Sequence, residues 1–63
     1  MKEINQLKTV LAEKNVTGKW LAEQLGKDPS TVSKWCSNSS QPPLEMVIRI
    51  AELLAVDIND LIK

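Results

Sequence analysis

The side chains that could do chemistry are few in this chain and of limited kinds. It has no histidine, no tyrosine and one cysteine, Cys36. These absences remove most general acid and base catalysts, the common metal ligands and any disulfide within the chain. Four carboxylates near the end, Glu45, Glu52, Asp57 and Asp60, have the positions of a solvent-exposed helix face and a helix cap. The sequence therefore predicts a protein that is not an enzyme and holds no metal and no cofactor.

A short polar segment offers hydrogen-bonding groups at helical spacing. Residues 30–37 divide into two arcs when they are placed on a helix with about 100° per residue. Ser30, Ser33, Lys34 and Ser37 share the outward arc, and Val32, Trp35 and Cys36 share the inward arc. The outward side chains offer no apolar surface for a protein partner to bind, but they are slim and polar enough to enter the major groove of DNA. This face therefore predicts contact with double-stranded DNA.

Two helices joined by a tight turn must position this polar face. Thr17 is a candidate N-cap for a helix over residues 19–25, and Gly26 supplies the left-handed residue that ends it. Asp28 is a candidate N-cap whose side chain can accept hydrogen bonds from the next helix, and Pro29 suits the first position of that helix. Because a single residue separates Gly26 from Asp28, the helices meet at a sharp angle, as in a helix-turn-helix.

Three further helices are predicted around this pair. Apolar residues at helical spacing indicate a first and a fourth helix, and Asp57 is a candidate cap for a short last one. The apolar positions are Ile4, Leu7, Val10 and Leu11 in the first helix, Leu44, Val47, Ile48, Ala51, Leu54 and Ala55 in the fourth, and Ile58, Leu61 and Ile62 in the last. The sequence thus predicts an all-α fold, a single compact five-helix domain over residues 1–63.

Charge and hydropathy exclude other classes of protein. The apolar runs are far shorter than the roughly 20 residues that span a bilayer, and no signal-peptide pattern opens the chain, so we expect a soluble, cytoplasmic protein. The formal net charge is zero, so any basic surface must be local. Residues 14–40 carry four lysines against two carboxylates, whereas residues 41–63 carry four carboxylates against two basic residues. The half with the predicted helix-turn-helix is therefore the positive half.

Two segments resemble a known family. They are VTGKWLAEQLGKDPSTVSKW and LEMVIRIAELLAVDINDLI, within an ungapped similarity from Val16 to Ile62. They resemble the phage-repressor, Cro-type helix-turn-helix domains, also called the xenobiotic response element (XRE) family. The resemblance implies a fold like that of the lambda repressor, with helices two and three as the helix-turn-helix. It also implies binding of operator DNA as a symmetric dimer, with the third helix in the major groove.

The resemblance also implies which residues contact DNA. The residues expected at base edges are Pro29, Ser30, Ser33 and Lys34. Those expected at phosphates are Thr17, Gly18, Lys19, Lys27, Thr31, Ser37 and Asn38. Two of these depart from the family pattern, because the family often has glutamine where this chain has Gly18 and glycine where it has Asn38. Asparagine tolerates the left-handed conformation that such a glycine adopts.

The fourth helix carries more apolar residues than a surface helix needs. Met46 and Leu53 widen its apolar arc. With Ile58 and Ile62 they could form the self-complementary face of a homodimer. The first helix or the end of the chain could equally cover them.

Two functions from different classes fit these observations. The first is a sequence-specific transcriptional regulator, most simply a repressor, that binds a palindromic operator as a homodimer and needs no small-molecule ligand. The alternative is a protein-interaction module, such as an antitoxin that neutralises a toxin through its last two helices, with DNA binding secondary. The two differ in salt dependence, because phosphate contacts weaken steeply with salt and an apolar interface does not.

Overall fold

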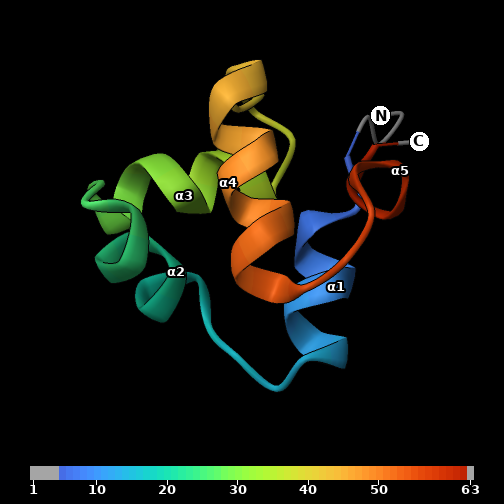
Figure 1. The fold of residues 1–63 in the computed structure, drawn as a ribbon. Helices are drawn as coiled ribbons and strands as arrows, with labels where there is room; N and C mark the ends of the chain where they lie inside the picture. Colours follow the sequence, from blue (N-terminus) through green and yellow to red (C-terminus); the bar gives the residue numbers. More distant parts are fainter. Residues whose placement is uncertain (1–4, 63) are drawn as a thin grey trace.

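The computed structural model describes residues 5–62, and this part of the chain is helical with short connections (Figure 1). Its helices are α1 (Leu7–Glu13), α2 (Gly18–Leu25), α3 (Pro29–Cys36), α4 (Leu44–Leu54) and α5 (Ile58–Leu61). An antiparallel bridge between Asn5 and Ile62 brings the two ends of the described chain together. The predicted all-α, five-helix fold is confirmed. Ile4, which we expected on the first helix, lies outside the described residues.

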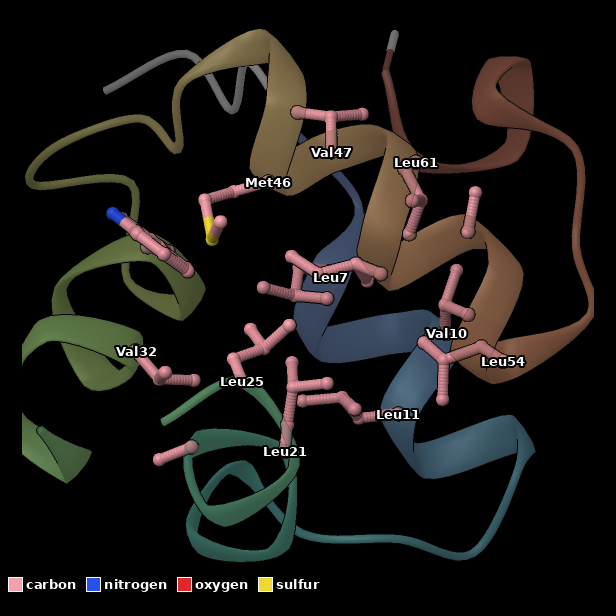
Figure 2. Close-up of a cluster of buried hydrophobic side chains, with 14 residues drawn as sticks. Leu7, Val10, Leu11, Leu21, Leu25, Val32, Met46, Val47, Leu54 and Leu61 are labelled. Carbon is pink, nitrogen blue, oxygen red and sulfur yellow. The ribbon is translucent and has the colours of Figure 1, made fainter. Parts of the chain in front are cut away.

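All five helices contribute to one aliphatic core (Figure 2). The buried apolar residues are Leu7, Val10, Leu11, Leu21, Ala22, Leu25, Val32, Trp35, Met46, Val47, Ile50, Ala51, Leu54 and Leu61. Trp35 is the large filler of this core, while Trp20 is half-buried and packs against its edge. None of the helices in residues 5–62 is long and apolar enough to cross a membrane.

Residues in the left-handed conformation terminate α2 and α3. Gly26 ends α2 with φ 68°, and Lys27 N–H donates to the Ala22 carbonyl at 2.9 Å. Asn38 follows α3 with φ 63°, and Ser39 N–H donates to the Lys34 carbonyl at 2.9 Å. This hydrogen bond to the carbonyl five residues back is the Schellman ending of a helix. The left-handed ends expected at Gly26 and Asn38 are thus confirmed.

The N-caps lie where the sequence predicts them, but one predicted capping hydrogen bond is absent. The Thr17 hydroxyl accepts a hydrogen bond from Trp20 N–H at 3.0 Å, and Asp57 forms a capping box with Asp60. Asp28 occupies the N-cap of α3, but its carboxylate makes no capping hydrogen bond, so that part of the prediction is wrong. At this N-cap the third helical N–H, from Thr31, donates to the Asp28 backbone carbonyl at 3.0 Å.

The predicted orientation of the fourth helix is partly wrong. The structure buries Met46 and Ile50 of α4, whereas Leu44 is 67% exposed and Ile48 is 41% exposed. The apolar arc of this helix is wide enough that either orientation covers the core with apolar side chains. Contacts of α4 with α2 and α5 select the observed one.

The burial of Met46 corrects the predicted dimer face. Its side chain is 7% exposed and lies in the core of the single chain, so it has little surface left for a second copy. Leu53 and Ile62 are exposed, and Ile58 is half-buried. The apolar side chains that do reach the surface of α4 are therefore Leu44, Ile48 and Leu53.

Candidate nucleic-acid interface

The helix-turn-helix forms one side of the molecule. Figure 1 shows α2 and α3 together on this side, with α4 between them and the side where α1 and α5 lie. The start of α2 lies against the middle of α3, because a Cβ atom added to Gly18 would lie 3.6 Å from Val32 Cγ1 and 4.0 Å from Cys36 Sγ. These are ordinary van der Waals distances. The angle between the two helices is therefore supported by contact as well as by the turn at Gly26.

The structure places the predicted base-contacting residues together at the surface. Pro29, Ser30, Ser33 and Lys34 are all exposed on α3, while Val32 on the opposite side is fully buried. The outward and inward arcs expected from helical spacing are therefore those observed. The exposed arc offers hydroxyl groups, which donate and accept hydrogen bonds, and one ammonium group, which donates.

The predicted phosphate-contacting residues surround this arc. The exposed ones are Thr17, Lys19, Lys27 and Ser37, and the half-buried ones are Gly18, Thr31 and Asn38. Some of their polar groups already have partners within the chain. Besides the cap made by the Thr17 hydroxyl, the Ser37 hydroxyl donates to the Lys34 carbonyl at 3.2 Å and lies 2.9 Å from the Ser39 hydroxyl. That backbone N–H groups at the start of α2 donate to phosphates stays a prediction.

A buried asparagine next to α3 was not predicted from the sequence. Asn5 is 7% exposed, and its side-chain Nδ2 donates to the Trp35 carbonyl at 3.0 Å and to Gln41 Oε1 at 2.7 Å. Its backbone N–H donates to Asn38 Oδ1 at 2.9 Å, and Gln41 Nε2 donates to the same oxygen at 3.2 Å. We call Asn5, Asn38 and Gln41 the Asn5 clasp. It ties the N-terminal segment to the end of α3 and the loop that follows.

Only part of the Asn5 clasp has a local signal in the sequence. Asn5 Oδ1 accepts a hydrogen bond from Leu7 N–H at 3.0 Å, and an asparagine just before an apolar helical stripe is a recognised start signal. Its other partners lie 30 to 36 residues away along the chain. No spacing rule within one element connects such residues, so these contacts were missed.

The cysteine on α3 is not in a reactive setting. Cys36 is half-buried beside the start of α2. Burial raises the pKa of the Cys36 thiol above its ordinary value, and the positive charge of Lys8 opposes that shift only partly. A thiol with a raised pKa stays protonated near neutral pH and is a poor nucleophile. This agrees with the expected role of Cys36 as a packing residue.

Comparisons with known proteins identify the class to which this arrangement belongs. A family model described as helix-turn-helix matches residues 7–61. The chain therefore belongs to the helix-turn-helix family, as the resemblance to XRE-type domains indicated, and this membership makes it a DNA-binding regulator and not an enzyme. No curated protein matches the chain significantly.

One solved structure is similar over nearly all of the chain. It is described as "Crystal structure of a putative DNA-binding protein from Bacteroides fragilis" and is 57% identical to this chain, with a TM-score of 0.93. The similarity covers 95% of this chain and 97% of that one. The five-helix arrangement is therefore shared with a protein determined by crystallography.

Proposed function

We propose that this protein is a sequence-specific transcriptional regulator, acting as a repressor, that binds a palindromic operator as a homodimer. The observation that carries the proposal is the exposed arc of α3, where Ser30, Ser33 and Lys34 stand at the surface while Val32 fixes the helix from behind. A short helix with a slim polar face fits the width of the major groove. The similar Bacteroides fragilis structure, described as that of a "putative DNA-binding protein", supports the same partner.

Each exposed side chain of α3 has a chemical role in this proposal. Lys34 donates to guanine O6 and N7, and the hydroxyls of Ser30 and Ser33 donate to or accept from either member of a base pair. The Pro29 ring contacts a thymine methyl group. Serines contribute little selectivity alone, so Lys34 carries most of the base discrimination.

The distribution of charge orients the protein on DNA. Lys14, Lys19, Lys27 and Lys34 are exposed in the half that contains α2 and α3. The half that contains α4 and α5 has an excess of carboxylates, which phosphates repel. Long-range electrostatics therefore favour an approach with α2 and α3 facing the duplex, and leave α4 and α5 for a partner subunit through Leu53, Ile58 and Ile62.

Selection of DNA from a random-sequence pool tests this function. The purified protein is incubated with the pool at about 0.15 M salt, where specific and non-specific binding separate. We expect recovery of a short palindrome with half-sites about one helical turn apart. A featureless pool would overturn the proposal.

A matched pair of charge variants tests the role of α3 on the selected operator. Lys34→Ala removes an exposed charge on α3, and Glu52→Ala removes an exposed charge on α4. We expect Lys34→Ala to weaken binding about 5- to 150-fold, which corresponds to about 1 to 3 kcal/mol for a good base contact, and to relax one base position. Glu52→Ala should change affinity less than about twofold. Equal effects of the two variants would contradict the assignment.

The exposed apolar residues of α4 and α5 support a second candidate function. Leu44, Ile48, Leu53 and Ile62 are each at least 40% exposed, and such side chains can bind a protein such as a toxin. Salt titration separates the candidates. Affinity for DNA should fall with a logarithmic slope of about −0.9 per phosphate contacted, whereas an apolar complex with a protein should hardly respond.

A further inference from the structure

We propose that Asn5 is a positioning residue for DNA recognition: through the Asn5 clasp it holds the C-terminal end of α3 and the following loop in the pose that the operator requires. This inference rests on the proposed function. Asn5 lies in the N-terminal segment, outside the helix-turn-helix, and acts through Trp35 and Asn38. It therefore adds a determinant of specificity that does not itself touch DNA.

The hydrogen bonds of Asn5 converge on the end of α3. Its Nδ2 donates to the Trp35 carbonyl, which also accepts from Asn38 N–H at 3.2 Å as part of the helix ending. Asn38 Nδ2 in turn lies 3.4 Å from the Asn5 carbonyl. The last turn of α3 and the left-handed residue after it are thus held from the same side by one asparagine.

The segment that carries Asn5 is itself firmly attached. Gln6 N–H donates to the Leu61 carbonyl at 2.8 Å, beside the bridge between Asn5 and Ile62. Asn5 Oδ1 accepts from the first N–H of α1. The clasp therefore connects α3 to the joined ends of α1 and α5, so α3 is held by more than its contact with α2.

The loop after α3 is not closely packed on its inner side, so packing there does not hold it in place of the clasp. An apolar hollow of about 140 Å³ lies beside the loop, lined by Asn5, Gln41 and Pro42 together with Val47, Ile50 and Leu61. A gap of this kind gives little dispersion attraction across it. The hydrogen bonds from Asn5 therefore restrain this side of the loop, together with those from Ser39 and Ser40 N–H to the Lys34 carbonyl.

The position of α3 matters because hydrogen bonds to bases tolerate little displacement. The helix has only eight residues, and Lys34 and Ser37 lie in its last turn and at its end. If this end shifts, Lys34 moves relative to the base edges and Ser37 relative to its phosphate, while the contacts at Pro29 and Ser30 are kept. The expected signature is a loss of base discrimination rather than a uniform loss of affinity.

The test compares variants of Asn5 on the operator selected by the wild type. Asn5→Asp keeps the oxygen that accepts from Leu7 N–H but removes the Nδ2 donors to Trp35 and Gln41. Gln41→Ala removes one partner at an exposed position, where folding is least at risk. Val10→Ala is the control, because it creates a cavity in the buried face of α1 away from the clasp. All are measured where circular dichroism shows a folded protein.

The measured quantity is the ratio of specific to non-specific affinity, together with the base preference at each operator position. Asn5→Asp should lower the ratio about 10-fold, which is comparable to removing one weak hydrogen bond to a base. Gln41→Ala should lower it less, and Val10→Ala should leave it unchanged within about twofold. An unchanged ratio in Asn5→Asp would overturn the inference while the proposed function stands. If the wild type selects no sequence, the proposed function fails and this inference fails with it.

Discussion

The middle of α3 is held by apolar packing against α2, whereas its C-terminal end is held both by the burial of Trp35 and by hydrogen bonds that reach back to Asn5. Val32, in the middle of α3, is fully buried and lies against Gly18 of α2. At the start of α3 the Asp28 carboxylate makes no capping bond. At the other end, Asn38 and the Trp35 carbonyl are both bonded to Asn5.

Because of this difference, the start of α3 has polar groups available to contact DNA, while polar groups at its end hold the helix in position. Packing from behind leaves the polar groups at the start of α3 available at the surface, where Pro29 and Ser30 are exposed. At the end of α3, the Asn38 side-chain amide and backbone N–H are already hydrogen-bonded within the chain. A phosphate contact by Asn38 remains a prediction, and it would have to form without disrupting the clasp.

The largest effect on stability is expected from weakening the apolar packing in the middle of α3. Val32→Ala removes two methyl groups from a site with no solvent exposure, and the reduced burial and the cavity should cost about 2 to 3 kcal/mol of unfolding free energy. Urea denaturation followed by circular dichroism measures this. Ser33→Ala, at the neighbouring exposed position, is the control and should change stability by less than about 0.5 kcal/mol. A similar small loss for Val32→Ala would mean that packing against α2 does not hold α3.

Substitution of Asn38 tests the hydrogen-bonded end and should have the next largest effect. Asn38→Ala removes the clasp bonds that the Asn38 side chain makes and places alanine at φ 63°, for an expected cost of about 2 kcal/mol. Asn38→Gly removes the same bonds but accepts this φ freely, so its cost should be about 1 kcal/mol. Thermal unfolding of the two variants separates the backbone contribution from the side-chain contribution. Equal losses would assign the whole effect to the clasp.

The two ends of α3 also differ in how far the sequence predicts them. At the start of α3, Gly26, Asp28 and Pro29 lie within four positions of one another, and each signals its own local conformation. The helix-turn-helix and its exposed face were therefore predictable, and so was the family. The Asn5 clasp was not, because its bonds join residues that only the completed fold brings together.

The orientation of α4 could not be predicted from the sequence, for a different reason. Leu44 and Ile48 are as apolar as Met46 and Ile50, and all fit helical spacing. Hydrophobicity alone could not decide which pair faces the core, since an error in orientation exchanges one apolar side chain for another. Only contact with the other helices settles it, and the inclusion of Met46 in the predicted dimer face was wrong for this reason.

The smallest effects on stability are expected from the N-cap residues of α2 and α3. They test whether each cap side chain adds to the stability of its helix. Thr17→Ala removes a capping hydrogen bond to Trp20 N–H and should cost about 1 kcal/mol. Asp28→Ala removes a side chain that makes no capping bond, so only its interaction with the helix dipole disappears, about 0.3 to 0.5 kcal/mol. Urea denaturation of both variants checks this order, and a larger loss for Asp28→Ala would show that its carboxylate does cap α3 in solution.

The same carboxylate should oppose DNA, because Asp28 is exposed beside the predicted base-contacting residues. Asp28→Asn removes its charge and keeps its size, so repulsion from phosphates falls and affinity for DNA should rise a few-fold at low salt. Glu45→Gln, an exposed change on α4, is the matched control and should leave affinity unchanged. If both variants raise affinity equally, the gain reflects net charge, and the start of α3 does not face the duplex.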